Sequence, residues 1–188
     1  QVCAARTGQV LNVTNLARDC GVSTTTAIEW LGILENTMQI YLLKPYYPNI
    51  TKRIIRSPKL YFLDTGLASY LTKWGSADSL RMGNMAGAFF ETFVVSEIIK
   101  SFLFRGIDPS IYYLRDKEGH EVDLVIEKDG LHLIEVKLTA TIKPEYSDNL
   151  EYFSGKSDKF LTKSILSLVD GKITAPGEVT YIPYTAIN

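Results

Sequence analysis

Two acidic triplets lie close together in the second half of the chain. The apolar run 121–127 begins with Glu-Val-Asp, ending at Asp123, and the run 131–138 carries Glu-Val-Lys between Glu135 and Lys137. Side chains alternate between the faces of a strand, so pairing the two runs would bring Asp123 and Glu135 together. Adjacent carboxylates need a cation or a shared proton, and Mg²⁺ or Mn²⁺ prefers such oxygen ligands. A metal held there would activate water and stabilise a phosphoryl transition state.

The turn at 128–130 sets the register of these two strands. A three-residue loop with its final glycine left-handed, as a G1 bulge, pairs Asp123 with Glu135 and Glu121 with Lys137. Opposed Cβ atoms would then lie about 4.5–5.5 Å apart. A two-residue turn would put Asp123 on the wrong face, so the hydrophobic pattern selects the longer loop. Each strand should then have one apolar face and one face that ends in charges, where Lys137 can orient a nucleophile or neutralise developing charge.

The elements around this hairpin define the fold class. A long apolar helix over 83–104 carries Glu91. Further patterns predict strands at 111–114, 160–168 and 179–182 and a helix at 145–153. The order of helix, three strands, helix and two strands predicts a mixed α/β (α+β) domain over 83–188.

The first half predicts a smaller domain over 1–62. A helix over 14–19 should end at Gly21, and Ser23 should cap a second helix over 24–36. Two strands would follow as a hairpin, at 40–43 and 52–55. Two helices followed by a β-hairpin are typical of a winged helix. A strand at 59–63 and a short helix at 67–72 lead through a connector, 63–82, into the second domain.

Positive charge gathers in the first half, although the chain as a whole has a net charge of −1. Residues 1–82 hold 9 Lys and Arg against 5 Asp and Glu, whereas residues 83–188 hold 11 against 16. A local positive field suits phosphate, so DNA is a predicted partner. The basic hairpin is a better candidate for this contact than the second helix, which carries Glu29. The predicted nucleic-acid contacts are Lys44, Lys52, Arg53, Arg56 and Lys59.

Several classes of protein are disfavoured by what the sequence lacks. No apolar run approaches the roughly 18 residues that span a membrane, and no secretory signal pattern opens the chain, so a cytoplasmic location is expected. No G-x-x-x-x-G-K-[ST] motif is present, so no ATP site is expected, and Gly155-Lys156-Ser157 is interpreted as a polar loop. The chain opens without Met and is expected to be a fragment of a longer protein.

The ordered acidic residues resemble the PD-(D/E)XK nuclease superfamily. The likeness covers about 60 residues and rests on Gly87-Ala-Phe-Phe-Glu91 followed by the two acidic triplets. It implies that Asp123, Glu135 and the Val136 carbonyl bind Mg²⁺ or Mn²⁺, that Glu91 assists, and that Lys137 is catalytic. Two features depart from the pattern: Val, not Pro, precedes Asp123, and no Gln-containing helix motif follows Lys137.

A narrower resemblance spans nearly the whole chain. The segment Lys59-Leu-Tyr-Phe-Leu-Asp-Thr-Gly66, together with the motifs above, is similar to the C-terminal region of a bacterial and archaeal family of AAA+-type ATPases. There a winged-helix segment links the ATPase to a nuclease-like domain of unknown function. The resemblance implies an upstream ATPase module as a partner.

Three functions remain open from the sequence. The first is metal-dependent cleavage of DNA by an endonuclease-like site. The second is a non-catalytic module that binds DNA or protein for the ATPase, and the third is a transcription regulator. Each functional interpretation has a structural alternative. In these alternatives Glu121 and Lys137 form only a cross-strand ion pair, Asp123 and Glu135 are solvated strand residues, and His120 and His132 have structural roles.

Overall fold

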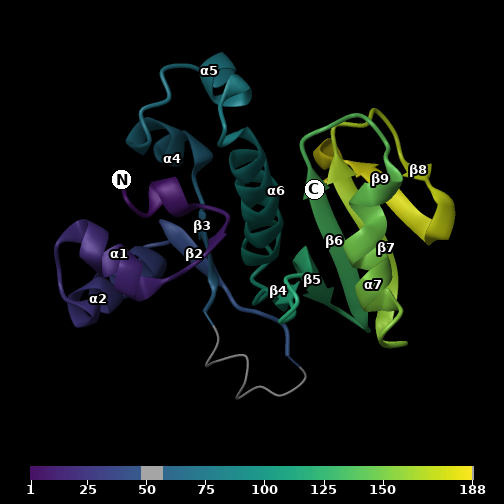
Figure 1. The fold of residues 1–188 in the computed structure, drawn as a ribbon, viewed down its shortest axis with the longest axis horizontal. Helices are drawn as coiled ribbons and strands as arrows, with labels where there is room; N and C mark the ends of the chain where they lie inside the picture. Colours follow the sequence, from purple (N-terminus) through teal and green to yellow (C-terminus); the bar gives the residue numbers. More distant parts are fainter. Residues whose placement is uncertain (48–56, 188) are drawn as a thin grey trace.

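The computed structural model describes residues 1–47 and 57–187. Figure 1 shows two groups of strands on either side of a long helix. The smaller sheet has the strand order β1-β3-β2, and the larger, six-stranded sheet has the order β4-β5-β6-β7-β9-β8. The predicted mixed α/β class is confirmed.

The N-terminal elements follow the expected order of two helices and a strand. The chain passes through η1 (Ala4–Arg6) and β1 (Gln9–Val10) into α1 (Val13–Cys20), α2 (Thr24–Asn36) and β2 (Ile40–Leu43). Gly21 ends α1 in the left-handed conformation with φ 68°. The Ser23 side chain accepts the Thr26 N–H at the start of α2.

The pairing of β2 differs from the expected hairpin. Its antiparallel partner among the described residues is β3 (Lys59–Phe62), which also pairs with β1. The sequence pattern predicts this segment as a separate strand that leads into the connector. The predicted return strand at 52–55 lies outside the described residues.

Three helices follow β3. Asp64 caps α4 (Thr65–Leu71) by accepting the Leu67 N–H. A capping box begins α5 (Ala77–Met82), and α6 runs over Ala86–Leu103. The connector 63–82 therefore contains two short helices where the sequence predicted one.

The larger sheet mixes both strand directions. Strands β4, β5 and β6 are antiparallel neighbours, β6, β7 and β9 run parallel, and β8 is antiparallel to β9. Its elements, with the intervening helices, are β4 (Ile111–Arg115), β5 (Glu121–Glu127), β6 (Leu131–Lys137), η2 (Pro144–Ser147), α7 (Asp148–Ser154), β7 (Phe160–Ser167), β8 (Ile173–Thr174), η3 (Pro176–Glu178), β9 (Val179–Pro183) and η4 (Tyr184–Ala186).

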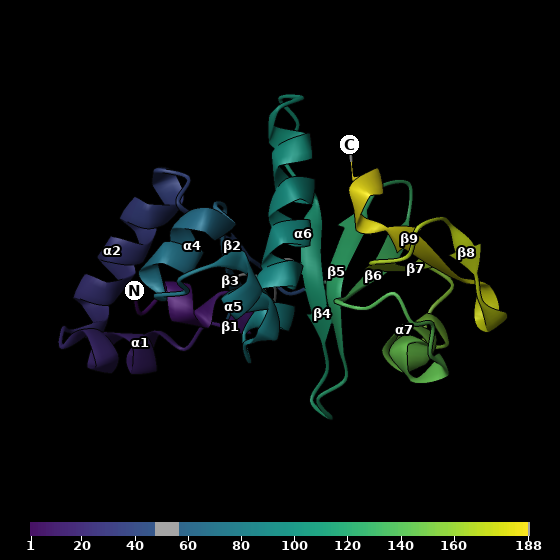
Figure 2. The ribbon, with the colours of Figure 1, turned by 90° about the horizontal axis from the view of Figure 1, so that it is seen from above.

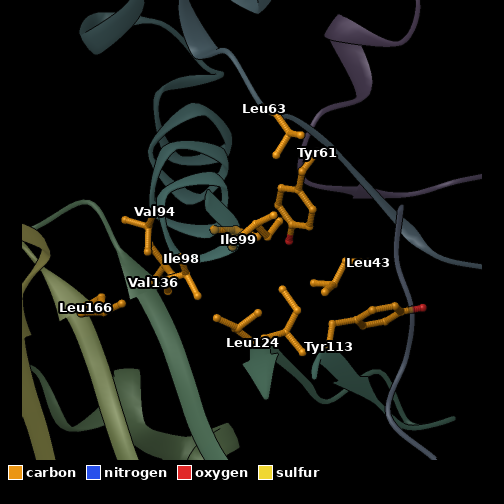
Figure 3. Close-up of a cluster of buried hydrophobic side chains, with 12 residues drawn as sticks. Leu43, Tyr61, Leu63, Val94, Ile98, Ile99, Tyr113, Leu124, Val136 and Leu166 are labelled. Carbon is orange, nitrogen blue, oxygen red and sulfur yellow. The ribbon is translucent and has the colours of Figure 1, made fainter. Parts of the chain in front are cut away.

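Helices α6 and α7 cover opposite faces of this sheet (Figure 2). Leu124 of β5 packs in the cluster that includes α6, whereas its neighbour Val125 packs in the cluster that includes α7. The α6 cluster also takes in Leu43 and Tyr61 from the smaller sheet, as Figure 3 shows. The two sheets are thus joined through one apolar core, with α6 between them.

Candidate functional site

The β5–β6 hairpin has the predicted register near its turn. Val125 pairs with Leu133 and Glu127 with Leu131. The turn geometry differs from the expected glycine bulge, because Asp129 is the left-handed residue with φ 55°, while Gly130 has φ 148°. The face of β5 and β6 that ends in charges is apolar near the turn, where Val125 and Leu133 are fully buried in the cluster that includes α7.

The hairpin opens at Asp123, where the ladder ends. The last paired residues are Leu124 and Ile134, so the expected pairing of Asp123 with Glu135 is not part of the ladder. The register between β4 and β5 also shifts here, as at a β-bulge. Asp123 Oδ2 instead accepts the backbone N–H of Val136 at 2.9 Å. A carboxylate therefore stands where strand pairing would have continued.

The opening between β5 and β6, with Asp123, Glu135 and Val136, is called the fork below. Glu135 is buried there, with only 2% of its side chain exposed. Its Oε2 accepts from Lys137 Nζ at 3.0 Å, while Oε1 is buried without a hydrogen-bond partner among the described residues. Burial and the Asp123 charge raise the pKa of Glu135 to about 9, and Lys137 only partly offsets them. The interpretation of Asp123 and Glu135 as solvated strand residues is therefore wrong.

Glu91 joins the site from α6. Its Oε1 accepts from the Tyr61 hydroxyl at 2.5 Å and from Lys59 Nζ at 3.1 Å. Burial raises the pKa of Glu91 to about 7, with a further contribution from the Asp123 charge. The helix and the hairpin thus bring Glu91 and Glu135 close enough to Asp123 for its charge to raise the pKa of both.

Lys59 is the unexpected member of this cluster. Its Nζ lies 2.6 Å from Glu121 Oε1, 3.1 Å from Glu91 Oε1 and 3.5 Å from Asp123 Oδ1, and its side chain is 3% exposed. Burial alone would lower the pKa of Lys59, but the three carboxylates reverse this effect and raise it. The expectation that Lys59 contacts nucleic acid needs correction, because its ammonium is enclosed by the acidic site.

Other predicted residues are placed as follows. Glu121 pairs with Lys59 and with Arg115 at 3.1 Å, whereas Lys137 pairs with Glu135, so the proposed Glu121–Lys137 pair does not form. Lys44 is exposed. Three predicted basic contacts lie outside the described residues: Lys52, Arg53 and Arg56.

The two histidines have structural partners. His132 bonds through its ring nitrogens to Thr162 Oγ1 and the Lys128 carbonyl. His120 stacks on Tyr152 with ring centroids 3.8 Å apart. Both side chains therefore fit the structural interpretation.

Sequence reasoning missed the contributions of Lys59 and Tyr61. Both belong to β3, about thirty residues before Glu91, and a periodic pattern cannot reveal a contact made between two sheets. The signal that was present is the conjunction of a lysine and a tyrosine in an otherwise apolar strand, since buried ionisable groups require partners.

The donor set can be compared with the needs of a divalent cation. Across residues 1–47 and 57–187, no group of three or more Asp, Glu, His or Cys side chains is arranged as a ready metal site. The Asp123 and Glu135 carboxylates are nevertheless hard oxygen ligands, and Glu135 Oε1 lacks a partner. The chemistry of these two carboxylates suits a divalent cation, and Lys59 is the cation already found beside Asp123.

Comparison with known proteins identifies the family of this chain. Residues 86–187, more than half of its length, match the domain of unknown function DUF4143. The chain belongs to the DUF4143 family. Residues 1–78 match a second domain of unknown function, DUF8612. The acidic residues from α6 and the hairpin therefore lie in the DUF4143 match, whereas Lys59 and Tyr61 lie in the DUF8612 match.

Two curated relatives are the uncharacterized proteins Mb2031c of Mycobacterium bovis and Rv2008c of Mycobacterium tuberculosis. Each is 34% identical over 136 residues, covering 71% of this chain and 30% of the relative. The chain thus spans less than a third of the length of these relatives.

One chain of a solved half-complex of Thermococcus gammatolerans McrB AAA+ hexamers with bound McrC aligns with this protein. The alignment covers 97% of this chain and 46% of the chain in that structure. The identity is 11% and the TM-score 0.36, so weak a likeness that it says nothing about function. Within the described ranges, no helix has the length and apolar composition needed to cross a membrane.

Proposed function

We propose that the DUF4143 part of this chain is a PD-(D/E)XK-type, metal-dependent phosphodiesterase that cleaves DNA. The observation that carries the proposal is the fork between β5 and β6. There Asp123 binds the Val136 N–H at 2.9 Å and Glu135 buries a carboxylate oxygen without a partner. Glu135 thus has Lys137 as its partner at one oxygen only, and its pKa is raised to about 9. A buried carboxyl group with so perturbed a pKa is a candidate for ligand binding.

Each residue of the fork has a distinct role in this proposal. Asp123, Glu135 and the Val136 carbonyl would hold Mg²⁺ or Mn²⁺, with Glu91 assisting. When bound, the cation would supply water activation and charge stabilisation at the phosphoryl group. Lys137, held 3.0 Å from Glu135 Oε2 and one-third exposed, can turn toward substrate and neutralise developing negative charge.

The context of the site is part of the same proposal. On the sequence resemblance, residues 1–62 act as a winged-helix segment and residues 83–188 as the nuclease-like domain, downstream of an AAA+-type ATPase module. Strands β2 and β3 follow α1 and α2 along the chain and pair antiparallel, which supports the winged-helix assignment of residues 1–62. DNA would be contacted by exposed Lys44 and by Lys52, Arg53 and Arg56.

A cleavage assay tests the activity. The purified chain is incubated with supercoiled plasmid and either Mn²⁺ or EDTA, beside the Asp123→Asn, Glu135→Gln and Lys137→Met variants. Cleavage should need the metal and be lost at least about a hundredfold in each variant, in the range of transition-state contacts. Glu145→Gln, an exposed carboxylate on η2, is the matched control. Equal cleavage by all four variants would exclude this site as the source of activity.

A second function is favoured by the charge balance around Lys59. The Lys59 ammonium, with three carboxylate partners, supplies a positive charge inside the cluster without metal, as a structural site would require. The chain would then be a non-catalytic module that binds DNA or protein for the ATPase. This second function predicts DNA binding that weakens with rising salt. The binding should be unaffected by EDTA and should persist in Glu135→Gln.

A further inference from the structure

We propose that Lys59 competes with the divalent cation for the acidic site, so that the N-terminal sheet controls whether the site can bind metal. This inference rests on the proposed function, because it names the regulation of that same site. Lys59 belongs to the DUF8612 match, whereas its three carboxylate partners belong to the DUF4143 match.

The contacts of the ammonium carry the competition. One Nζ atom lies within 3.5 Å of oxygens from Glu91, Glu121 and Asp123, which come from α6 and from both ends of the opened part of β5. Asp123 would also be a metal ligand. Two cations that close would repel each other strongly in a buried site, so metal binding and the inserted Lys59 oppose each other.

The surroundings of Lys59 tie its position to the N-terminal sheet. Its backbone lies in the central strand of that sheet, paired with Val10 on one side and Leu43 on the other. The Tyr113 ring stands 5.8 Å from Nζ, and the Tyr113 hydroxyl donates to the Ser57 carbonyl at 2.7 Å. Withdrawal of the ammonium therefore requires the side chain to leave an enclosed position or β3 to move relative to α6.

Thermodynamic linkage makes the effect reciprocal. If an inserted Lys59 weakens metal binding by some factor, bound metal weakens the insertion of Lys59 by the same factor. A partner that binds residues 1–62 and moves β3 relative to α6 would therefore strengthen metal binding without contacting the metal ligands.

The first test is a titration of Mn²⁺ into the wild type, Lys59→Met and Lys163→Met. Lys163 is a matched control, because it is also a largely buried strand lysine, paired with Glu151 at 2.8 Å outside the acidic site. Lys59→Met should bind Mn²⁺ at least about tenfold more tightly than the wild type, within the usual range of coupling, and Lys163→Met should not. Equal affinity in Lys59→Met and wild type overturns the competition while leaving the metal site intact. Absence of binding in every variant overturns both proposals.

A second test uses the wild-type chain, in case Lys59→Met does not fold. Lysines are acetylated briefly with and without saturating Mn²⁺, and each site is quantified by mass spectrometry. Lys59 should be protected without metal and be acetylated several-fold faster with it, while Lys163 stays constant as the internal reference. Continued protection of Lys59 in the presence of bound Mn²⁺ would overturn the inference.

Discussion

Asp123 Oδ2 accepts the Val136 N–H at 2.9 Å, so a carboxylate closes the strand ladder at the point where β5 leaves β6. This contact fixes Asp123 beside Glu135 and gives it two tasks. It satisfies a buried backbone donor, and it presents its other oxygen, Oδ1, to the cation position at which Lys59 is found. The two tasks can be separated by mutation.

Asp123→Ala and Asp123→Asn should therefore differ in stability. Alanine leaves the buried Val136 N–H without its acceptor, a loss of about 1–3 kcal/mol in the free energy of unfolding. Asparagine can still accept that hydrogen bond through its amide oxygen and should lose less. Urea unfolding in EDTA measures the difference. Equal stability of the two variants would mean that this hydrogen bond contributes nothing to the fold.

Glu135 should make the chain less stable as pH rises from 7 to 9. The unfolded carboxyl releases its proton near pH 4.5, whereas burial raises the pKa of folded Glu135 to about 9. Between these values the folded chain binds more protons than the unfolded chain, so the free energy of unfolding falls as pH rises. The slope cannot exceed about 1.4 kcal/mol per pH unit for one group.

The Glu135→Gln variant provides the control for this slope. Glutamine does not titrate, so the variant should lose less stability than the wild type between pH 7 and 9, measured by urea unfolding in EDTA. Glu91 has a pKa raised to about 7 and contributes mainly below this window. Parallel slopes for wild type and variant would show that Glu135 is ionised throughout.

Metal affinity should rise with pH for the same reason. A divalent cation that binds the Glu135 carboxylate must displace its proton, because the pKa of that group is raised to about 9. Calorimetry in buffers of differing ionisation enthalpy should detect release of roughly one proton per Mg²⁺ near pH 7. Binding without proton release would place the metal away from Glu135.

Tyr61→Phe should weaken the attachment of α6 to β3. The Tyr61 hydroxyl donates to Glu91 at 2.5 Å, and its removal should reduce the free energy of unfolding by about 1.5–3 kcal/mol, as for a hydrogen bond to a charged group. Tyr181→Phe loses a hydroxyl that donates to the Lys143 carbonyl at 3.1 Å and serves as the comparison. A smaller effect for Tyr61→Phe than for Tyr181→Phe would contradict the expected strength of the Glu91 contact.

Local patterns in the sequence predicted much of the fold. The bounds of α2, β2 and β5 agree with their periodicity and caps, because short-range rules specify those elements. The hairpin register near the turn was also predictable from the apolar pattern. The opening at Asp123 was not, because a bulge is a tertiary compromise between β4, β5 and β6 that leaves the sequence pattern intact.

The site was predicted only in part, for a related reason. Asp123, Glu135 and Lys137 could be grouped from the hairpin pattern, and Glu91 only through the resemblance to the nuclease superfamily. The burial of Lys59 among the carboxylates depends on how the N-terminal sheet meets α6, which neither periodicity nor net charge encodes. A basic stretch was therefore interpreted as a surface for phosphate, although one of its lysines is an internal counterion.

The most direct test of the account is calorimetric titration of Mg²⁺ and Mn²⁺ into the purified chain, beside Asp123→Asn, Glu135→Gln and the Glu145→Gln control. The account predicts one saturable site that both fork variants lose and the control retains. The account would be contradicted by binding that persists unchanged in Asp123→Asn and Glu135→Gln. It would also be contradicted if neither the wild type nor Lys59→Met bound metal.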